Sequence, residues 1–408
     1  MDNNMPKLQP QYALMDWSSL IPDLLVEIAT RLPDVEDFMA FRGVCAWWRT
    51  AVTKDKFGPS WPRVPLLMLV EKEEEGSMER EFYSLSKSKV CMRSSLPLAK
   101  GKRCFEVRFG WLMSLADYDE VTLWNPLSGL QFGLPDFQGF PDYRDCDPLI
   151  FITKAVLSEN PSKVSDFTLV AICRSVFLVF WRPGNRNWTL IKTKRDSAFL
   201  DVNYFKGKFH AINTCGNIWV WDGNTPLAHI VLSINFYLLP RYSKLYLVES
   251  SSKYSSETGE AELLLILRLE NMYEDGDDSS DEEADQVYKT KYFYTRHFKV
   301  YQLDTARNDW AEIPHLGGDA LFVGYNATIA VPGSEPKTRN GIKPNCIYFS
   351  DDRWLTFQEM GGGGRDMGIY NMEDGNVERL DGLDVGIDVQ DKSVLSFISP
   401  PLWIPPNT

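Results

Sequence analysis

The chain lacks the residue groupings that most metal and thiol chemistry requires. Its seven cysteines stand singly without a CxxC pair, and its four histidines are far apart without an HExxH spacing. An odd number of scattered cysteines argues against a disulfide framework or a zinc knuckle. We therefore expect reduced thiols, no metal site and no cofactor. The cysteines are Cys45, Cys91, Cys104, Cys146, Cys173, Cys215 and Cys346.

Signals for secretion or membrane insertion are also missing. No apolar span reaches the roughly 18 residues of a transmembrane helix, and no basic stretch followed by an apolar one lies near the start. We expect no membrane association and a location in the nucleus, the cytoplasm or both.

Positive charge is outweighed by negative charge. The 43 Lys and Arg against 56 Asp and Glu give a net charge of −13, which opposes non-specific attraction to phosphates, so we expect no nucleic-acid partner. The run EDGDDSSDEEAD at 274–285 holds eight of the carboxylates and accounts for all but −5 of that charge. We expect residues 274–286 to be a disordered insertion. Within it, Ser279 and Ser280 lie before acidic residues and are candidate phosphorylation sites.

Motifs for nucleophilic and phosphate chemistry are absent as well. There is no G-x-S-x-G elbow, and the glycine run at 361–364 before Arg365 lacks the Lys-Ser/Thr of a phosphate loop. We expect this run to be a flexible loop, and the neighbouring Asp351 and Asp352 to be solvated turn residues. The sequence therefore predicts no catalytic residue and a protein that is not an enzyme.

Residues 17–52, WSSLIPDLLVEIATRLPDVEDFMAFRGVCAWWRTAV, carry apolar residues at helical spacing. Pro22 is suited to open a first helix, Pro33 to end it, and Gly43 to end a second helix before a third apolar stripe. A unit this small cannot bury enough surface to be stable alone. It is therefore either a cap on the main domain or a docking unit for another protein.

The strings W-S-x-L-I-P-x-x-L-L-x-x-I-x-x-R-L and F-R-x-V-C-x-x-W-R resemble an F-box. This three-helix motif docks substrate receptors on the Skp-type adaptor of cullin–RING ubiquitin ligases. Ile21 departs from the Leu that is usual at its position. Carried over by position, the resemblance implies these adaptor-facing residues: Leu20, Ile21, Pro22, Leu24, Leu25, Ile28, Leu32, Val44, Cys45 and Trp48.

The remaining sequence changes to short strands separated by turn signals. An aromatic strand, an Asp- or Asn-led turn and a short closing strand recur in VTLWNPLSGLQFGLP, FLVFWRPGNRNWTLI, IWVWDGNTPLAHIVL, FKVYQLDTARNDWAEIP and MGIYNMEDGNVERL. Such repeats in an all-β chain predict a β-propeller. We expect about six blades, the first formed by 65–97 with a closing strand from 394–406, because joining the ends removes an exposed edge.

This part resembles the kelch-like C-terminal domains of plant F-box proteins. The expected fold is mainly β with a small helical module: an F-box over 16–56, a short linker over 57–65 and a kelch-like propeller over 66–408. The resemblance implies no transferable site residue in the propeller.

The two resemblances together imply a substrate-recognition subunit of a ubiquitin ligase. The F-box would bind the adaptor and through it a cullin, and the propeller would bind a protein substrate for ubiquitination. Two alternatives stay open. The propeller could bind a small molecule, for which a buried polar cluster at the channel mouth is the expected sign, and the sequence displays none. The chain could also be a non-degradative scaffold.

Overall fold

The computed structural model describes residues 16–32, 35–53, 64–71, 79–116, 120–126, 128–138, 140, 151–193, 197–233, 243–250, 261–274, 291–304, 309–325, 328–332, 341–353, 363–383, 396 and 399–405. The chain forms two compact units, Met1–Pro62 and Arg63–Thr408. Ser279 and Ser280, the acidic insertion beyond Glu274 and most of the expected linker lie outside the described residues. In the described residues no helix is both long and apolar enough to cross a bilayer.

The first unit contains the three expected helices, preceded by a short 3₁₀ turn. They are η1 (Trp17–Ser19), α1 (Pro22–Ala29), α2 (Val35–Gly43) and α3 (Ala46–Ala51). Pro22 occupies the first turn of α1, where its missing N–H leaves no bond unmade. That helix ends at Ala29, before the expected stop at Pro33. The next amides bond three residues back, from Arg31 to Ile28 and from Leu32 to Ala29.

The core of the helical unit is small. Its buried side chains are Leu25, Ala29, Phe38, Trp48 and Val52, with partly buried neighbours around them. Phe41 packs on Trp48 with ring centroids 4.4 Å apart. At about 25 cal/mol per Å², so few buried groups stabilise the unit only modestly.

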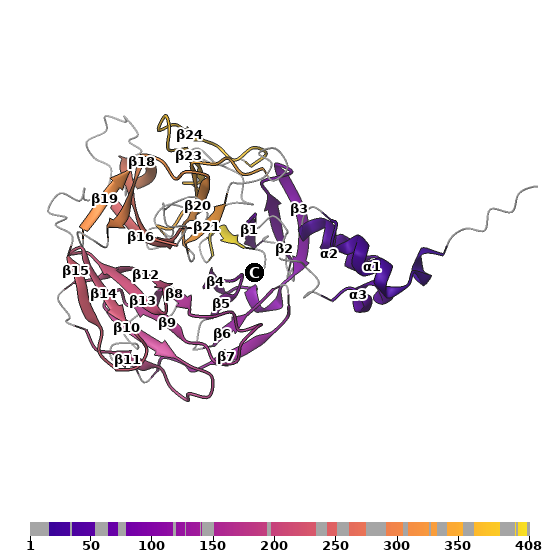
Figure 1. Ribbon diagram of the computed structural model, residues 1–408, viewed down its shortest axis with the longest axis horizontal. Coiled ribbons are helices and arrows are strands. Elements are labelled where there is room, and N and C mark those ends of the chain that lie inside the picture. The colour runs from indigo at the N-terminus through magenta and orange to yellow at the C-terminus, as the bar shows by residue number, and fades with distance from the viewer. Residues whose placement is uncertain are drawn as a thin grey trace, which may run out of the picture. The chain divides into compact units, whose positions relative to one another are not determined.

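The second unit is a six-bladed β-propeller, as expected, with the sheets set around a common centre (Figure 1). Blade 1 comprises β25 (Leu402–Ile404), β1 (Leu66–Glu71), β2 (Glu79–Ser84) and β3 (Lys89–Ser95). Blade 2 comprises β4 (Arg103–Glu106), β5 (Leu112–Leu115), β6 (Val121–Trp124) and β7 (Gln131–Leu134). Blade 3 comprises β8 (Ile152–Leu157), β9 (Leu169–Cys173), β10 (Phe177–Trp181) and β11 (Thr189–Ile191).

The other three blades complete the ring. Blade 4 comprises β12 (Phe199–Phe205), β13 (Lys208–Asn213), β14 (Asn217–Trp221) and β15 (His229–Ser233). Blade 5 comprises β16 (Ser243–Glu249), β17 (Leu263–Glu274), β18 (Lys291–Asp304) and β19 (Asp309–Ile313). Blade 6 has five strands in the order β21 (Ile329–Pro332), β20 (Asp319–Val323), β22 (Cys346–Phe349), β23 (Gly368–Asn371) and β24 (Val377–Glu378). Within it β20 and β22 run parallel, unlike every other paired strand described.

The two ends of the propeller sequence meet in blade 1. Strand β25 pairs antiparallel with β1, placing Leu66 opposite Ile404 and Leu67 opposite Trp403. The closing strand expected from 394–406 is therefore confirmed. The pairing gives each of these strands a neighbour and links the first blade to the last residues of the chain.

The five sequence repeats each comprise the last two strands of a blade and the turn between them, in blades 2 to 6. In the repeats of blades 3 and 4, the tryptophan at the end of the third strand donates a hydrogen bond to the turn that follows it. Trp181 donates its indole N–H to the carbonyl of Asn185 at 3.0 Å, and Trp221 donates to the carbonyl of Thr225. The recurring tryptophan therefore satisfies a turn carbonyl with a side-chain donor.

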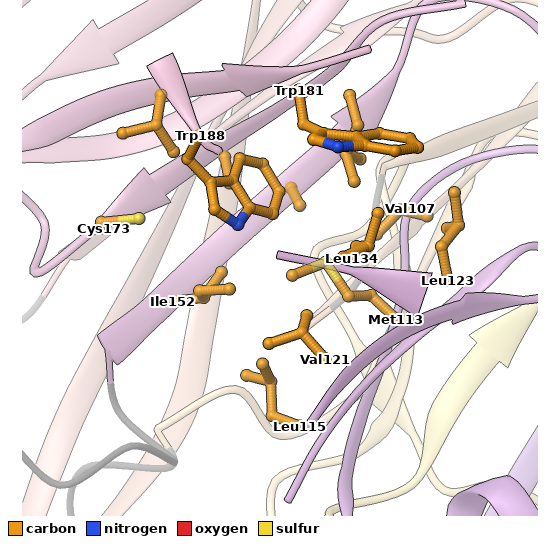
Figure 2. Close-up of a cluster of buried hydrophobic side chains, with 14 of the residues drawn as sticks. Val107, Met113, Leu115, Val121, Leu123, Leu134, Ile152, Cys173, Trp181 and Trp188 are labelled. Carbon is orange, nitrogen blue, oxygen red and sulfur yellow. The ribbon is translucent and has the colours of Figure 1, made fainter. Parts of the chain in front are cut away.

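Large aromatic side chains fill the space between adjacent blades. Figure 2 shows Trp181 and Trp188 of blade 3 together with Met113 and Val121 of blade 2, and all four are buried in one hydrophobic cluster. Phe137 stacks on Trp188 with centroids 4.9 Å apart. These contacts between neighbouring blades replace the core that a single small sheet cannot form.

We predict that Trp403→Ala destabilises the propeller by about 3–5 kcal/mol, since its fully buried indole packs on Phe322 at 5.1 Å and on Tyr348 at 6.2 Å. Urea unfolding followed by circular dichroism measures the change. The exposed Leu130→Ala is the control, expected to stay within about 0.5 kcal/mol of the unmodified chain. Equal midpoints for the two variants would contradict the closing role of β25.

Candidate functional site

The helical unit exposes an unusual amount of apolar surface. Six large apolar side chains are between 40% and 62% exposed within a unit of about 40 residues. We call them the apolar seam: Trp17, Ile21, Leu24, Ile28, Val44 and Trp47. Three of them follow the i, i+3, i+7 spacing of one face of α1. Exposed apolar stripes of this kind are typical of interaction surfaces.

The ten residues carried over from the F-box resemblance do not share one environment. Ile21, Pro22, Leu24, Ile28 and Val44 are exposed. Leu20, Leu32 and Cys45 are half-buried, and Leu25 and Trp48 are buried in the core of the unit.

The ten residues therefore divide into members that pack the helical unit and members that are exposed. Leu25 and Trp48 hold the helices together, and the Cys45 sulfur caps α3 by accepting from the Trp48 amide at 3.5 Å. The exposed members are the ones available to a partner. Their contact with an adaptor stays a prediction.

Trp17 and Trp47 are seam residues that the positional comparison missed. The Trp47-Trp48 pair offered a signal, because successive helical residues point about 100° apart and only one of the two can face a small core. Trp48 faces that core and Trp47 remains outside it.

The tryptophans of α3 also fix the turn that precedes α1. The indole N–H of Trp47 donates to the carbonyl of Leu20 at 2.9 Å, and that of Trp48 donates to the carbonyl of Trp17 at 3.0 Å. Asp16 supports the same turn, since its side chain accepts from the Ser18 amide at 3.0 Å. The start of the seam is thus held in one conformation by its own unit.

The propeller contains a buried ionic cluster between blades 5 and 6. Its centre is the fully buried Arg268, whose guanidinium donates to Thr295 Oγ1 at 2.8 Å, to Asp366 Oδ2 at 2.8 Å and to the Ser350 carbonyl at 3.0 Å. Asp352 accepts from Lys244 at 2.6 Å and lies 3.4 Å from Arg268. The remaining members are Tyr246, Glu270 and Arg353.

One sequence-based expectation is wrong at this cluster. Asp351 and Asp352 are buried, whereas they were expected to be solvated. The reason for Asp352 is tertiary, because its partners Arg268 and Lys244 come from blade 5. In the described part of the glycine run, Gly363 pairs with Ser396, and the amides of Gly364 and Arg365 donate to Asp351 Oδ2 at 2.9 and 3.1 Å. The expected flexibility of that run stays a prediction.

The pKa values of the buried carboxyl groups in this cluster depend on burial and on the neighbouring charges. Burial alone would raise the pKa of Asp352, but the charges of Lys244 and Arg268 lower it to about 2. Burial raises the pKa of Glu270. A buried polar cluster is the sign expected of a small-molecule site. Here, however, the charged groups pair with one another. The arrangement therefore holds blade 5 to blade 6 through buried ion pairs.

A second set of charges crosses the centre of the ring. Arg108 of blade 2 donates to Glu249 of blade 5 at 2.7 Å and to the carbonyl of Tyr204 in blade 4 at 3.1 Å. Blades 2 and 5 lie opposite one another in the order of six. Lys154 and Asp201 form a further pair at 3.2 Å between blades 3 and 4. The described inner strands are thus joined by charges as well as by packing.

The loop that carries Arg108 is strained and clamped. Arg108, Phe109 and Gly110 have φ angles of 102°, 58° and 71°, a region that non-glycine residues rarely adopt. Glu106 holds the loop, since its Oε1 accepts from the amides of Arg108 and Gly110 at 2.8 and 3.1 Å. Burial raises the pKa of Glu106 to about 8.

In the described residues no three His, Cys, Asp or Glu side chains gather where they could hold a metal ion.

We predict that Arg268→Met lowers the free energy of unfolding by about 3–5 kcal/mol, because it leaves Asp352, Asp366 and Glu270 buried without their shared cation. Urea unfolding measures it. Lys299→Met is the control, since Lys299 pairs with Glu312 at 3.2 Å with both side chains exposed to solvent, and its loss should change stability by less than about 1 kcal/mol. If Arg268→Met changed the free energy of unfolding as little as the control variant does, the stabilising role of the ionic cluster would be contradicted.

We predict a pH-dependent stability from Glu106. Its pKa of about 8 in the folded chain lies above the ordinary 4.5, so the unfolded chain releases this proton first and stability is lost as pH rises from about 4.5 to about 8. Glu106→Gln should remove that loss, making the variant more stable than the unmodified chain at pH 8 but not near pH 4.5. Thermal unfolding across this range tests it, with the exposed Glu120→Gln as control. A pH-independent difference would contradict the assignment.

Comparisons with known proteins follow the same division of the chain. Residues 82–371 match the family described as KIB1-4 beta-propeller. The F-box protein SKIP23 of Arabidopsis thaliana is 26% identical over 431 aligned residues, covering 96% of each chain. The Arabidopsis thaliana F-box protein At2g17036 is 24% identical over 428 residues, covering 96% of this chain and 95% of that protein.

Among solved structures, the Cps50 (Swd1) beta-propeller domain of Myceliophteria thermophila covers 78% of this chain and 87% of its own. Its TM-score is 0.34 at 13% identity, a similarity too low to support any argument about this chain.

Proposed function

The chain belongs to the KIB1-4 beta-propeller family and is an F-box protein, and from that premise we propose that it is the substrate-recognition subunit of a cullin–RING ubiquitin ligase. Its F-box, taken as residues 16–56, binds a Skp-type adaptor and through it a cullin. The propeller, taken as residues 66–408 after a linker over 57–65, binds a protein substrate. The chain itself catalyses nothing.

The observation that carries this proposal is the apolar seam. In the described residues of the helical unit, six large apolar side chains are exposed to water and five apolar side chains are buried. Covering such a stripe with a partner's groove removes apolar surface from water at about 25 cal/mol per Å². Four of the six seam residues, Ile21, Leu24, Ile28 and Val44, are among those that the F-box resemblance implies to be adaptor-facing. The exposed Trp17 is a further candidate anchor, since tryptophan is enriched among residues that dominate binding energy.

The propeller supplies a rigid support for substrate binding. Its blades are packed face to face and joined by the Arg268 cluster and the Arg108–Glu249 pair. Loops on a rigid scaffold keep their positions and lose little freedom on binding. A substrate held there would have its lysines at high local concentration near the conjugating enzyme, so the acceleration comes from proximity.

We predict that Leu24→Glu abolishes capture by a recombinant Skp-type adaptor. The carboxylate would be buried without a partner in the interface, weakening binding by about 3 kcal/mol or roughly 100-fold. Glutamate in the first turn of α1 is favourable for the helix, so folding should be preserved. Surface-immobilised adaptor with the full chain in solution provides the measurement.

The matched control is Leu130→Glu, which alters an equally exposed leucine in the propeller and should bind like the unmodified chain. Capture of Leu24→Glu at unchanged affinity would contradict the adaptor role of the seam.

A further inference from the structure

We infer that Trp47 is a positioning residue for adaptor binding: it holds the turn Trp17–Ile21 in its docking conformation before the adaptor arrives. The inference rests on the proposed function, since the adaptor is the partner of the seam. It adds a residue that the F-box resemblance did not supply.

The two indole bonds give this turn its fixed place. In the described part of the helical unit, the hydrogen bonds between the turn and α3 come from Trp47 and Trp48, which donate to carbonyls three residues apart. Without them the turn keeps bonds within itself, such as those from Ser18 and Ser19 to Asp16, the bond from the Leu25 amide of α1 to the Ile21 carbonyl, and the packing of Leu20 on the core. None of these is a hydrogen bond between the turn and α3.

Trp47 is unusual because it is nearly half exposed and yet makes a directed bond of 2.9 Å. An exposed tryptophan that only contributed apolar surface would not require a hydrogen bond that fixes the orientation of its ring. Its bond to the Leu20 carbonyl instead orders the residues on both sides of Leu20, including the two most N-terminal seam residues, Trp17 and Ile21.

The benefit of this order is entropic. Fixing the backbone of a residue costs about 1–2 kcal/mol, so a turn already fixed in the free chain leaves less to be lost on association. A looser turn would still reach the adaptor, but a smaller fraction of free molecules would be in the docking conformation. Affinity falls in proportion to that fraction.

Trp47→Phe isolates the bond, since it keeps an aromatic ring and removes the N–H. We expect adaptor binding about two- to tenfold weaker, as for the loss of one hydrogen bond. In the free full chain, we expect faster amide exchange in residues 18–20, with unchanged exchange at Thr30 and Val52, whose amides bond to Val26 and Trp48. Trp48 is unsuitable for this substitution because it belongs to the core.

The paired measurements separate the outcomes. Weaker binding with unchanged exchange would make Trp47 a direct contact and overturn the positioning role, as would unchanged binding and exchange together. Faster exchange throughout the unit would mean loss of its fold and would equally overturn it. Ile21→Glu in the same assay reports on the premise. If that variant also binds normally, the proposed adaptor function fails, whereas if only Trp47→Phe behaves like the unmodified chain, the positioning role alone fails.

Discussion

The exposed apolar seam of the helical unit is the constraint on which the functional account depends. Three short helices around a core of five side chains can place Leu25, Phe38 and Trp48 inside, but they have no interior left for Ile21, Leu24 or Val44. The hydrophobic effect therefore favours association of this unit with a complementary groove. An F-box is such a unit, and the family membership of the chain agrees with that physical need.

In the propeller, by contrast, the apolar faces of the sheets are buried against neighbouring blades. Aromatic clusters fill the gaps between blades, and β25 closes the ring on β1. Buried ion pairs link blades 5 and 6, and the half-buried Arg108–Glu249 pair links the opposed blades 2 and 5. Buried charges are strongly destabilising when one partner is lost. The ionic cluster thus favours one arrangement of blades 5 and 6 over others.

Local patterns predicted the helices, the blade repeats and the closing strand, because helical spacing, strand alternation and turn residues act over a few positions. The error at Asp352 involves distant partners. Asp352 was expected in solvent because nothing nearby in sequence indicates Lys244 or Arg268, more than 80 residues away. The F-box resemblance also gave no separation between buried residues such as Leu25 and Trp48 and exposed ones such as Ile21, because family positions do not distinguish a core residue from a contact residue. For the same reason it did not single out Trp47.

The most direct test of the account is the hydrogen-exchange footprint of a Skp-type adaptor on the full chain. The account predicts slowed exchange in peptides covering η1, α1 and the start of α3, with the propeller blades unchanged. Slowed exchange on the blades alone, or none anywhere at saturating adaptor, would contradict the claim that the seam is the surface the adaptor covers.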